Sequence, residues 1–190
     1  MPAYRGTARI KLRRPSVPAA PSGPWSPLSL SNLLGWWKAD AGTDTTVDGA
    51  IIASWTDQSG NGNTLTVRSG SPKYDSTDAK NGLPVINTGT NAGLKTGSFT
   101  IGTTSQLSCF AVFKPTATSA GRIFGINQSG TDNGVGGGVL LVHPTTADLV
   151  IQRNGSLSAK VGALTGSAWN LAGCIFNGAA TDVYFGNGST

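Results

Sequence analysis

The residues of this chain best suited to acid–base chemistry are its carboxylates. All nine acidic residues are aspartates, at positions 40, 44, 48, 57, 75, 78, 132, 148 and 182, and glutamate is absent. Glycoside hydrolysis needs two carboxyl groups held on either side of the scissile bond. Most of these aspartates stand among Gly, Thr, Ser and Asn, where Asp accepts hydrogen bonds from nearby backbone amides. The pattern therefore predicts turn and cap residues, and we expect no enzymatic activity.

Other residues that could act as nucleophiles or metal ligands are few. The single histidine, His143, precedes Pro144 and has no second base beside it in the sequence. Cys109 and Cys174 lie in apolar runs, which favours buried reduced thiols, although a disulfide would form if their strands were neighbours. The glycine-rich residues 134–138 lack the Lys-Ser/Thr pair of a phosphate-binding loop. We therefore expect no cofactor and no zinc site.

A hard-cation site is the one metal site that the sequence suggests. Asp57, Asn61 and Asn63 fall within residues 57–63 (DQSGNGN), and their oxygen atoms suit calcium. The same side chains can instead cap the turn by bonding its own backbone, which needs no metal. We favour the capped turn and keep the three residues as weak calcium candidates.

Three tryptophans could contact a sugar. Trp36, Trp37 and Trp55 have aromatic faces that could stack on the C–H surface of a pyranose ring. Neighbouring residues on a strand point to opposite faces, so Trp36 and Trp37 cannot both enter one core. Core packing is the favoured interpretation, and glycan contact is the alternative.

The elements that must position these residues are short strands between turns. Gly is abundant, with 27 residues, and the absence of glutamate leaves little from which to build helices. Residues 107–114 form a near-continuous apolar run that predicts a strand covered on both faces, and Asn154-Gly155 predicts a tight hairpin. The predicted strands are residues 34–38, 50–55, 65–68, 83–86, 107–114, 122–127, 139–143, 149–152, 156–161, 169–177 and 182–185. The predicted core comprises Leu107, Phe110, Val112, Phe113, Ile123, Phe124, Leu141, Val150, Trp169, Ile175 and Tyr184.

The order of three segments suggests a family. Residues 33–43 (LLGWWKADAGT), 48–66 (DGAIIASWTDQSGNGNTLT) and 81–86 (NGLPVI) resemble the N-terminal half of concanavalin A-like, laminin-G-like jelly rolls. The resemblance extends well to about residue 115 and more loosely to Phe185. It implies a two-sheet antiparallel jelly-roll sandwich, a fold common in phage structural proteins and carbohydrate-binding modules. Glucanases of this superfamily use an E-x-D-x-x-E strand, which a chain without glutamate cannot contain.

The N-terminal residues 1–29 differ from the rest of the chain. Arg5 and the cluster at positions 9–14 carry all of the net charge of +5, and prolines stand at positions 2, 15, 18, 21, 24 and 27. Such a segment is predicted to be an extended tether. Alternation of charged and aliphatic residues would suit a strand added to a partner. The predicted partner-binding residues of this arm are Arg9, Ile10, Lys11, Leu12, Arg13, Arg14 and Trp25.

Two other interpretations of the arm remain. It could be a solubilising tail, which its composition favours equally, or it could bind nucleic acid, which we disfavour because aromatic residues are not interleaved with the cations. The segment lacks the apolar stretch of a secretion signal. No run in the chain approaches the roughly 18 apolar residues of a membrane span, so we expect no membrane partner.

These observations predict two parts, the arm (residues 1–29) and an all-β sandwich (residues 30–190). The chain ends with a strand pattern and turn residues, so we expect the natural chain to continue beyond Thr190, or a partner to supply the missing pairing. We expect a non-enzymatic virion protein made in the host cytoplasm and displayed on the particle surface, as a capsid decoration, fibre or tail module. It would be a homo-oligomer that binds other virion proteins through the arm and glycans through the sandwich. The alternative is a carbohydrate-binding module of a bacterial surface or secreted protein.

Overall fold

The computed structural model describes residues 24–89, 91–98, 106–115, 121–126, 139–143, 148–153, 156–163, 167–177 and 180–187. For Gln106, for the strands between residues 139 and 163, and from residue 174 onward, the description covers the backbone. Within these ranges the chain is all-β, which confirms the all-β part of the predicted fold class. The described strands pair antiparallel throughout, and the one helical element among the described residues is the three-residue 3₁₀ helix η1 (Pro27–Ser29).

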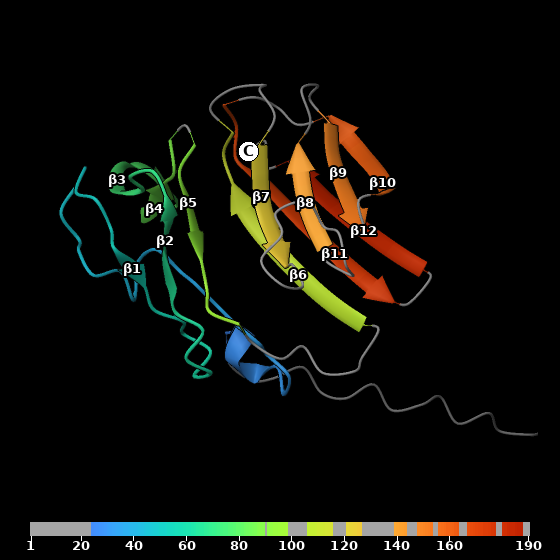
Figure 1. Ribbon diagram of the computed structural model, residues 1–190, viewed down its shortest axis with the longest axis horizontal. Coiled ribbons are helices and arrows are strands. Elements are labelled where there is room, and N and C mark those ends of the chain that lie inside the picture. The colour runs from blue at the N-terminus through green and yellow to red at the C-terminus, as the bar shows by residue number, and fades with distance from the viewer. Residues whose placement is uncertain are drawn as a thin grey trace, which may run out of the picture.

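The first five strands form two small sheets on one side of the molecule, coloured teal to green in Figure 1. One sheet has the order β1-β2-β5 and the other is the hairpin β3-β4. Ile52, Pro72 and Tyr74 are buried in this part of the molecule. Backbone hydrogen bonds join Ile52 to Pro72 and Tyr74 to Ala50. The bounds are β1 (Ser54–Trp55), β2 (Leu65–Ser69), β3 (Lys73–Lys80), β4 (Leu83–Asn87) and β5 (Gly93–Lys95).

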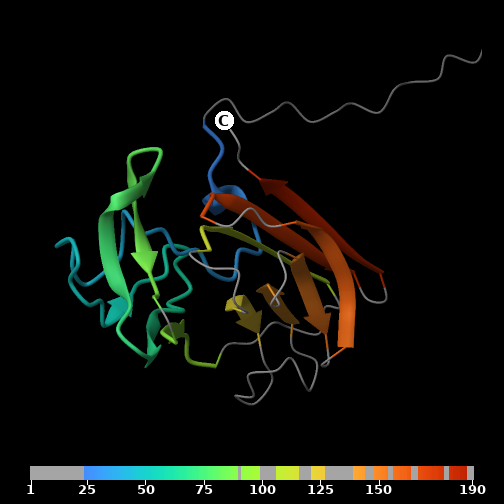
Figure 2. The same cartoon turned by 90° about the horizontal axis from the view of Figure 1, so that it is seen from above.

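The remaining strands form two larger sheets, which Figure 2 shows as two layers. The meander β10-β9-β8-β7 makes one layer, and the order β12-β11-β6 makes the other. β9 and β10 pair with Arg153 opposite Ser156, whereas the predicted Asn154-Gly155 turn lies outside the described residues. The bounds are β6 (Gln106–Phe113), β7 (Gly121–Ile126), β8 (Val139–His143), β9 (Asp148–Arg153), β10 (Ser156–Ala163), β11 (Asn170–Asn177) and β12 (Ala180–Asn187).

The predicted strands agree with the structure wherever apolar runs are long, and they fail at the N-terminal end. Residues 34–38 form no strand, and the predicted strand 50–55 is reduced to Ser54–Trp55. β3 and β5 were not predicted. Asn81 and Gly82, both with positive φ, connect β3 to β4 as a two-residue turn between the paired residues Lys80 and Leu83. Asn-Gly is a typical signal for such a turn.

β6 is not covered on both faces, which corrects its prediction as a two-sided central strand. Exposure alternates along it: Phe110 is 65% exposed and Val112 is 63% exposed, whereas Cys109 and Ala111 between them are partly buried. Placing Phe110 and Val112 in the core was therefore wrong. The other predicted core residues divide into two sets. Leu107, Phe113, Ile123, Phe124 and Trp169 are partly buried, and the side chains of Leu141, Val150, Ile175 and Tyr184 lie outside the description.

The inward face of the β12-β11-β6 sheet is marked by buried residues of β11. Ala172 is fully buried and pairs with Ala111, and the buried Asn170 donates its Nδ2 to the Ala168 carbonyl at 2.8 Å. Leu171, between them, is exposed on the same outer face as Val112, its register partner.

Within the described residues, no helix has the length and hydrophobicity needed to cross a membrane.

Candidate binding site

The Asp57 carboxylate is the centre of the hydrogen-bond network around the predicted site residues. Asp57 is only 6% exposed. Its Oδ1 accepts the backbone N–H groups of Trp36 (2.9 Å) and Ser59 (2.8 Å). Its Oδ2 accepts the Ser59 hydroxyl (2.7 Å) and the backbone N–H of Asn63 (3.1 Å). Asp57 therefore fixes the turn of residues 57–63, here called the Asp57 turn, against the extended segment of residues 33–38.

Both asparagines of the Asp57 turn reinforce this contact. Asn61 Nδ2 donates to the Leu33 carbonyl at 2.5 Å, and Asn63 Nδ2 donates to the Leu34 carbonyl at 2.7 Å. The Gln58 backbone N–H adds a 2.7 Å bond to the Trp36 carbonyl. The segment of residues 33–38 is thus held by side chains and single backbone bonds instead of a strand ladder. This explains why a strand-like sequence forms no strand there.

The three calcium candidates are committed to this turn. Burial raises the pKa of the Asp57 carboxyl, but hydrogen bonds from the Ser59 side chain and from the Trp36, Ser59 and Asn63 backbones lower the pKa by more. The net pKa lies below the usual value, so the carboxylate is ionised and its oxygens are occupied by donors. In the described part of the chain, no three His, Cys, Asp or Glu residues are grouped to hold a metal ion.

Two of the three predicted glycan-contact tryptophans use their indole N–H groups inside the protein. Trp37 Nε1 donates to the Asn63 carbonyl at 3.0 Å, and its ring folds back so closely that a Cβ on Gly35 would meet it. Trp55 Nε1 donates to the Lys38 carbonyl at 2.9 Å. Both rings are partly buried and both tie the extended segment to its neighbours. Their geometry fits a structural role.

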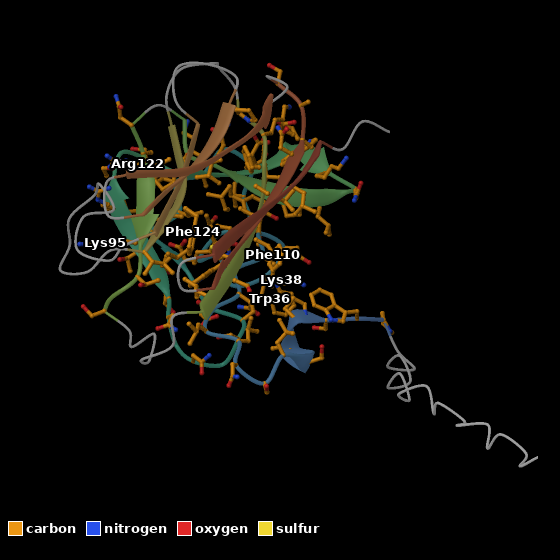
Figure 3. All side chains as sticks on the ribbon, turned by 90° about the vertical axis from the view of Figure 1, so that its right-hand side faces the viewer. Trp36, Lys38, Lys95, Phe110, Arg122 and Phe124 are labelled. Carbon is orange, nitrogen blue, oxygen red and sulfur yellow. The ribbon has the colours of Figure 1, made fainter. Side chains whose placement is uncertain are left out.

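Trp36 is different. Its backbone is fixed by Asp57 and Gln58, but among the described residues its indole N–H has no hydrogen-bond partner. The Lys38 ammonium lies 5.5 Å from the centroid of the Trp36 ring and 3.1 Å from Asp40 Oδ2. Figure 3 labels Trp36 and Lys38 near the base of the molecule. Trp36 is thus the one predicted tryptophan whose indole N–H has no hydrogen-bond partner within the described residues.

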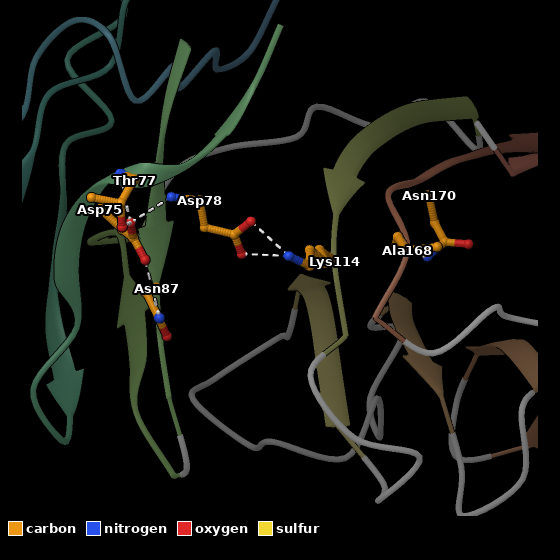
Figure 4. Close-up of polar contacts among 7 residues, drawn as sticks. All are labelled: Asp75, Thr77, Asp78, Asn87, Lys114, Ala168 and Asn170. Carbon is orange, nitrogen blue, oxygen red and sulfur yellow. Dashed lines mark hydrogen bonds and ion pairs between the residues drawn. The ribbon is translucent and has the colours of Figure 1, made fainter. Parts of the chain in front are cut away.

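The other described aspartates organise loops and ion pairs. Asp44 accepts backbone N–H groups from Ala53 and Ser54, and Asp48 accepts the backbone and hydroxyl of Ser76. Asp75 accepts from Thr77 and from the backbone of Asp78, as Figure 4 shows. The Asp78 backbone bond and the Thr77 hydroxyl are the main causes of a lowered Asp75 pKa.

Six of the predicted arm residues lie outside the described residues: Arg9, Ile10, Lys11, Leu12, Arg13 and Arg14. The structure does describe Trp25, which is 65% exposed. Leu28 and Leu30 in and after η1 are also exposed. Three large apolar side chains therefore face solvent where the arm joins the folded part. We call Trp25, Leu28 and Leu30 the arm-base cluster.

The two cysteines occupy the same register position of two neighbouring strands. The register of β6 and β11 places Cys109 directly opposite Cys174, which satisfies the condition that the sequence left open. His143 ends β8, where its backbone pairs with Gly121. The local bonds of Asp57 to Ser59 and Asn63 match the capped turn that the sequence favoured. Neither the cross-strand cysteine pair nor the bonds from this turn to residues 33–36 could be read from linear spacing, because each joins segments distant in the sequence.

No protein-family model, curated protein or solved structure showed significant similarity to the chain.

Proposed function

We propose that the chain is a non-enzymatic structural or accessory component of a virus particle, such as a capsid decoration, fibre or tail module. In this proposal residues 1–29 anchor the protein to neighbouring subunits. Residues 30–190 form a two-sheet jelly-roll sandwich displayed at the virion surface. The observation that carries the proposal is the arm-base cluster, because exposed apolar groups that follow a basic, proline-rich segment are suited to contact another protein.

The chemistry of the described carboxylates supports a non-enzymatic role. Asp44, Asp48, Asp57 and Asp75 accept hydrogen bonds from backbone amides, and Asp78 is paired with Lys114. General acid catalysis by a carboxyl group at neutral pH requires a raised pKa. The pKa values of Asp57 and Asp75 are both lowered by hydrogen bonds to their carboxylates. Each of these carboxylates thus accepts backbone amides or pairs with a cation.

The anchoring role is tested with purified particles from the virus that encodes the chain. The full chain should be present at a fixed copy number by quantitative mass spectrometry. A chain lacking residues 2–24 should fold but fail to incorporate, and Trp25→Ser with Leu28→Ser should reduce incorporation. The matched control is Val47→Ser, which alters an equally exposed apolar residue away from the arm base. Full incorporation of the truncated chain would show that the arm does not attach the protein.

A second candidate, carbohydrate binding, is favoured by Trp36. Its indole N–H has no partner among the described residues, and Lys38 and Asp40 add polar groups that could bond sugar hydroxyls. Trp36→Ala should then abolish binding on a glycan array, while the control Trp25→Ala, which alters an exposed tryptophan away from this site, leaves binding unchanged. Equal glycan binding by both variants, or no binding by the wild-type chain, would contradict carbohydrate binding through Trp36. Only the architectural role would then remain. Release of reducing ends from any bound polysaccharide would contradict the non-enzymatic proposal.

A further inference from the structure

The only two cysteines of the chain occupy one register position of one strand pair. β6 and β11 pair through eight consecutive positions, from Gln106 opposite Asn177 to Phe113 opposite Asn170, without a bulge. Cys109 and Cys174 face each other within this ladder, three positions from the Gln106 end. Figure 1 shows the two strands side by side. Because the ladder is unbroken on both sides of the pair, the strands cannot slip here without disrupting all eight positions.

This register matches what a disulfide requires. Directly opposed residues of an antiparallel pair have Cα atoms about 4.5 or 5.5 Å apart, depending on whether they form the hydrogen-bonded position. Disulfide-linked cysteines have Cα atoms about 4.4–6.8 Å apart. Opposed residues also lie on the same face of the sheet. The Cα separation expected at this register position therefore falls within the range that a disulfide spans.

Cys109 lies on the inward face of β6. Exposure alternates along β6, with Ser108 and Phe110 exposed on either side of the partly buried Cys109. The next inward position pairs Ala111 with the fully buried Ala172. A bond to Cys109 would start from this face, where the Cys109 side chain is partly buried. Such placement favours persistence of a disulfide once it has formed.

We propose that Cys109 and Cys174 are a redox-modification site that forms an intramolecular disulfide joining β6 to β11. The oxidant is a small-molecule disulfide such as oxidised glutathione. One cysteine thiolate attacks the oxidant and displaces one glutathione thiolate, which leaves a mixed disulfide on the protein. The second cysteine thiolate attacks the protein-bound sulfur and displaces the second glutathione. Two protein thiols lose two protons and two electrons, and one oxidant becomes two thiols. This inference rests on the register alone and holds whether or not the chain belongs to a virus particle.

The test measures the disulfide equilibrium in the folded and the unfolded chain. The full chain is refolded from denaturant in buffers that span ratios of reduced to oxidised glutathione, so that both thiols are accessible during folding. Free thiols are then blocked with an alkylating agent, and the mass of the intact chain is measured by mass spectrometry. We expect a species lighter than the fully reduced chain by two hydrogen atoms. Its digestion should yield a peptide that links residues 109 and 174. The equilibrium constant for forming the disulfide from oxidised glutathione should be about 30-fold or more larger in the folded chain than in denaturant.

Matched variants and a second measurement complete the test. Cys109→Ser and Cys174→Ser each keep one thiol and should show glutathione adducts but no lighter intramolecular species. Oxidation should raise the denaturation midpoint of the wild-type chain and leave that of either variant unchanged. If a variant does not fold, the disulfide equilibrium measured for the wild-type chain still tests the proposal. Two alkylated thiols after refolding in the most oxidising buffer would overturn the proposal, as would glutathione adducts on both cysteines or intermolecular dimers.

Discussion

At the scale of single residues, Asp57 shows how a carboxylate can replace secondary structure. It accepts four hydrogen bonds from Trp36, Ser59 and Asn63, which belong to two segments that share no strand pairing. A hydrogen bond to an ionised group contributes more than one between neutral groups. The Trp36 backbone, and with it the one candidate ligand-contact indole, depends on this carboxylate. The site and the stability of the N-terminal part are therefore coupled through Asp57.

Asp57→Asn should destabilise the protein by about 2–4 kcal/mol, because the amide turns a donor toward N–H groups that now lack an acceptor. Chemical denaturation measures the change. Asp40→Asn is the matched control, because Asp40 makes an exposed ion pair with Lys38 and should alter stability by less than about 1 kcal/mol. Equal effects of the two variants would show that the Asp57 network does not support the fold.

The lowered pKa values of Asp57 and Asp75 predict an acid-dependent loss of stability. A carboxyl whose pKa is lower in the folded than in the unfolded state binds fewer protons when folded, so the free energy of unfolding rises with pH. The stabilisation is complete above the unfolded pKa of about 4 and disappears as the pH falls through the folded pKa. Denaturation midpoints between pH 7 and pH 2.5 should fall most steeply below pH 4. The slope should be shallower for Asp57→Asn, and identical slopes would contradict the assignment.

At the scale of elements, the sequence predicted strands wherever apolar residues dominated. Residues 139–143 were predicted to the residue, and residues 65–68 and 83–86 lie within the observed β2 and β4. β3 was missed because its sequence, KYDSTDAK, is mostly polar. Its strand follows from pairing with β4 across the Asn81-Gly82 turn. That Asn-Gly signal was present in the sequence, but the polar residues before it concealed the hairpin.

Other parts of the site could not be predicted because they depend on long-range pairing. The prediction of a strand at residues 34–38 used β-propensity, whereas the structure depends on acceptors some 20 residues away, such as Asp57 for the Trp36 amide. The alternation of exposure along β6 depends on which sheet covers it. A continuous apolar run gives no information on that point, which is why Phe110 and Val112 were misplaced in the core.

The outer face of β6 should be dispensable for folding. Phe110→Ser combined with Val112→Ser removes two exposed side chains, so the free energy of unfolding should change by less than about 1 kcal/mol. Self-association at high concentration, measured by analytical ultracentrifugation, should decrease because an exposed apolar patch is removed. Phe113→Ser is the control from the inward face and should be strongly destabilising. A double variant as unstable as Phe113→Ser would show that the outer face is packed.

At the scale of the whole molecule, two groups of strands share little hydrogen bonding. In the described ranges, β1–β5 pair only among themselves and β6–β12 only among themselves. Lys114, immediately after β6, bridges the groups: its Nζ lies 2.6 and 2.7 Å from the two carboxylate oxygens of Asp78 in β3 (Figure 4). The same ammonium lies 5.9 Å from the Trp169 ring centroid, next to β11. One cation thus contacts both groups.

This bridge should couple the two groups more than it stabilises either one. Lys114→Met keeps the apolar stem and removes the charge, and Asp78→Asn removes the partner. Because both side chains are partly exposed, a double-mutant cycle should give a coupling energy of at most about 1 kcal/mol. Hydrogen exchange should accelerate in β3 and β4 of the Lys114→Met variant, while β8 and β9 keep their protection. Lys38→Met is the matched control, because Lys38 pairs with Asp40 only two residues away and cannot join the groups. Acceleration spread evenly over all strands would mean that the two groups unfold as one unit and that Lys114 contributes only to global stability.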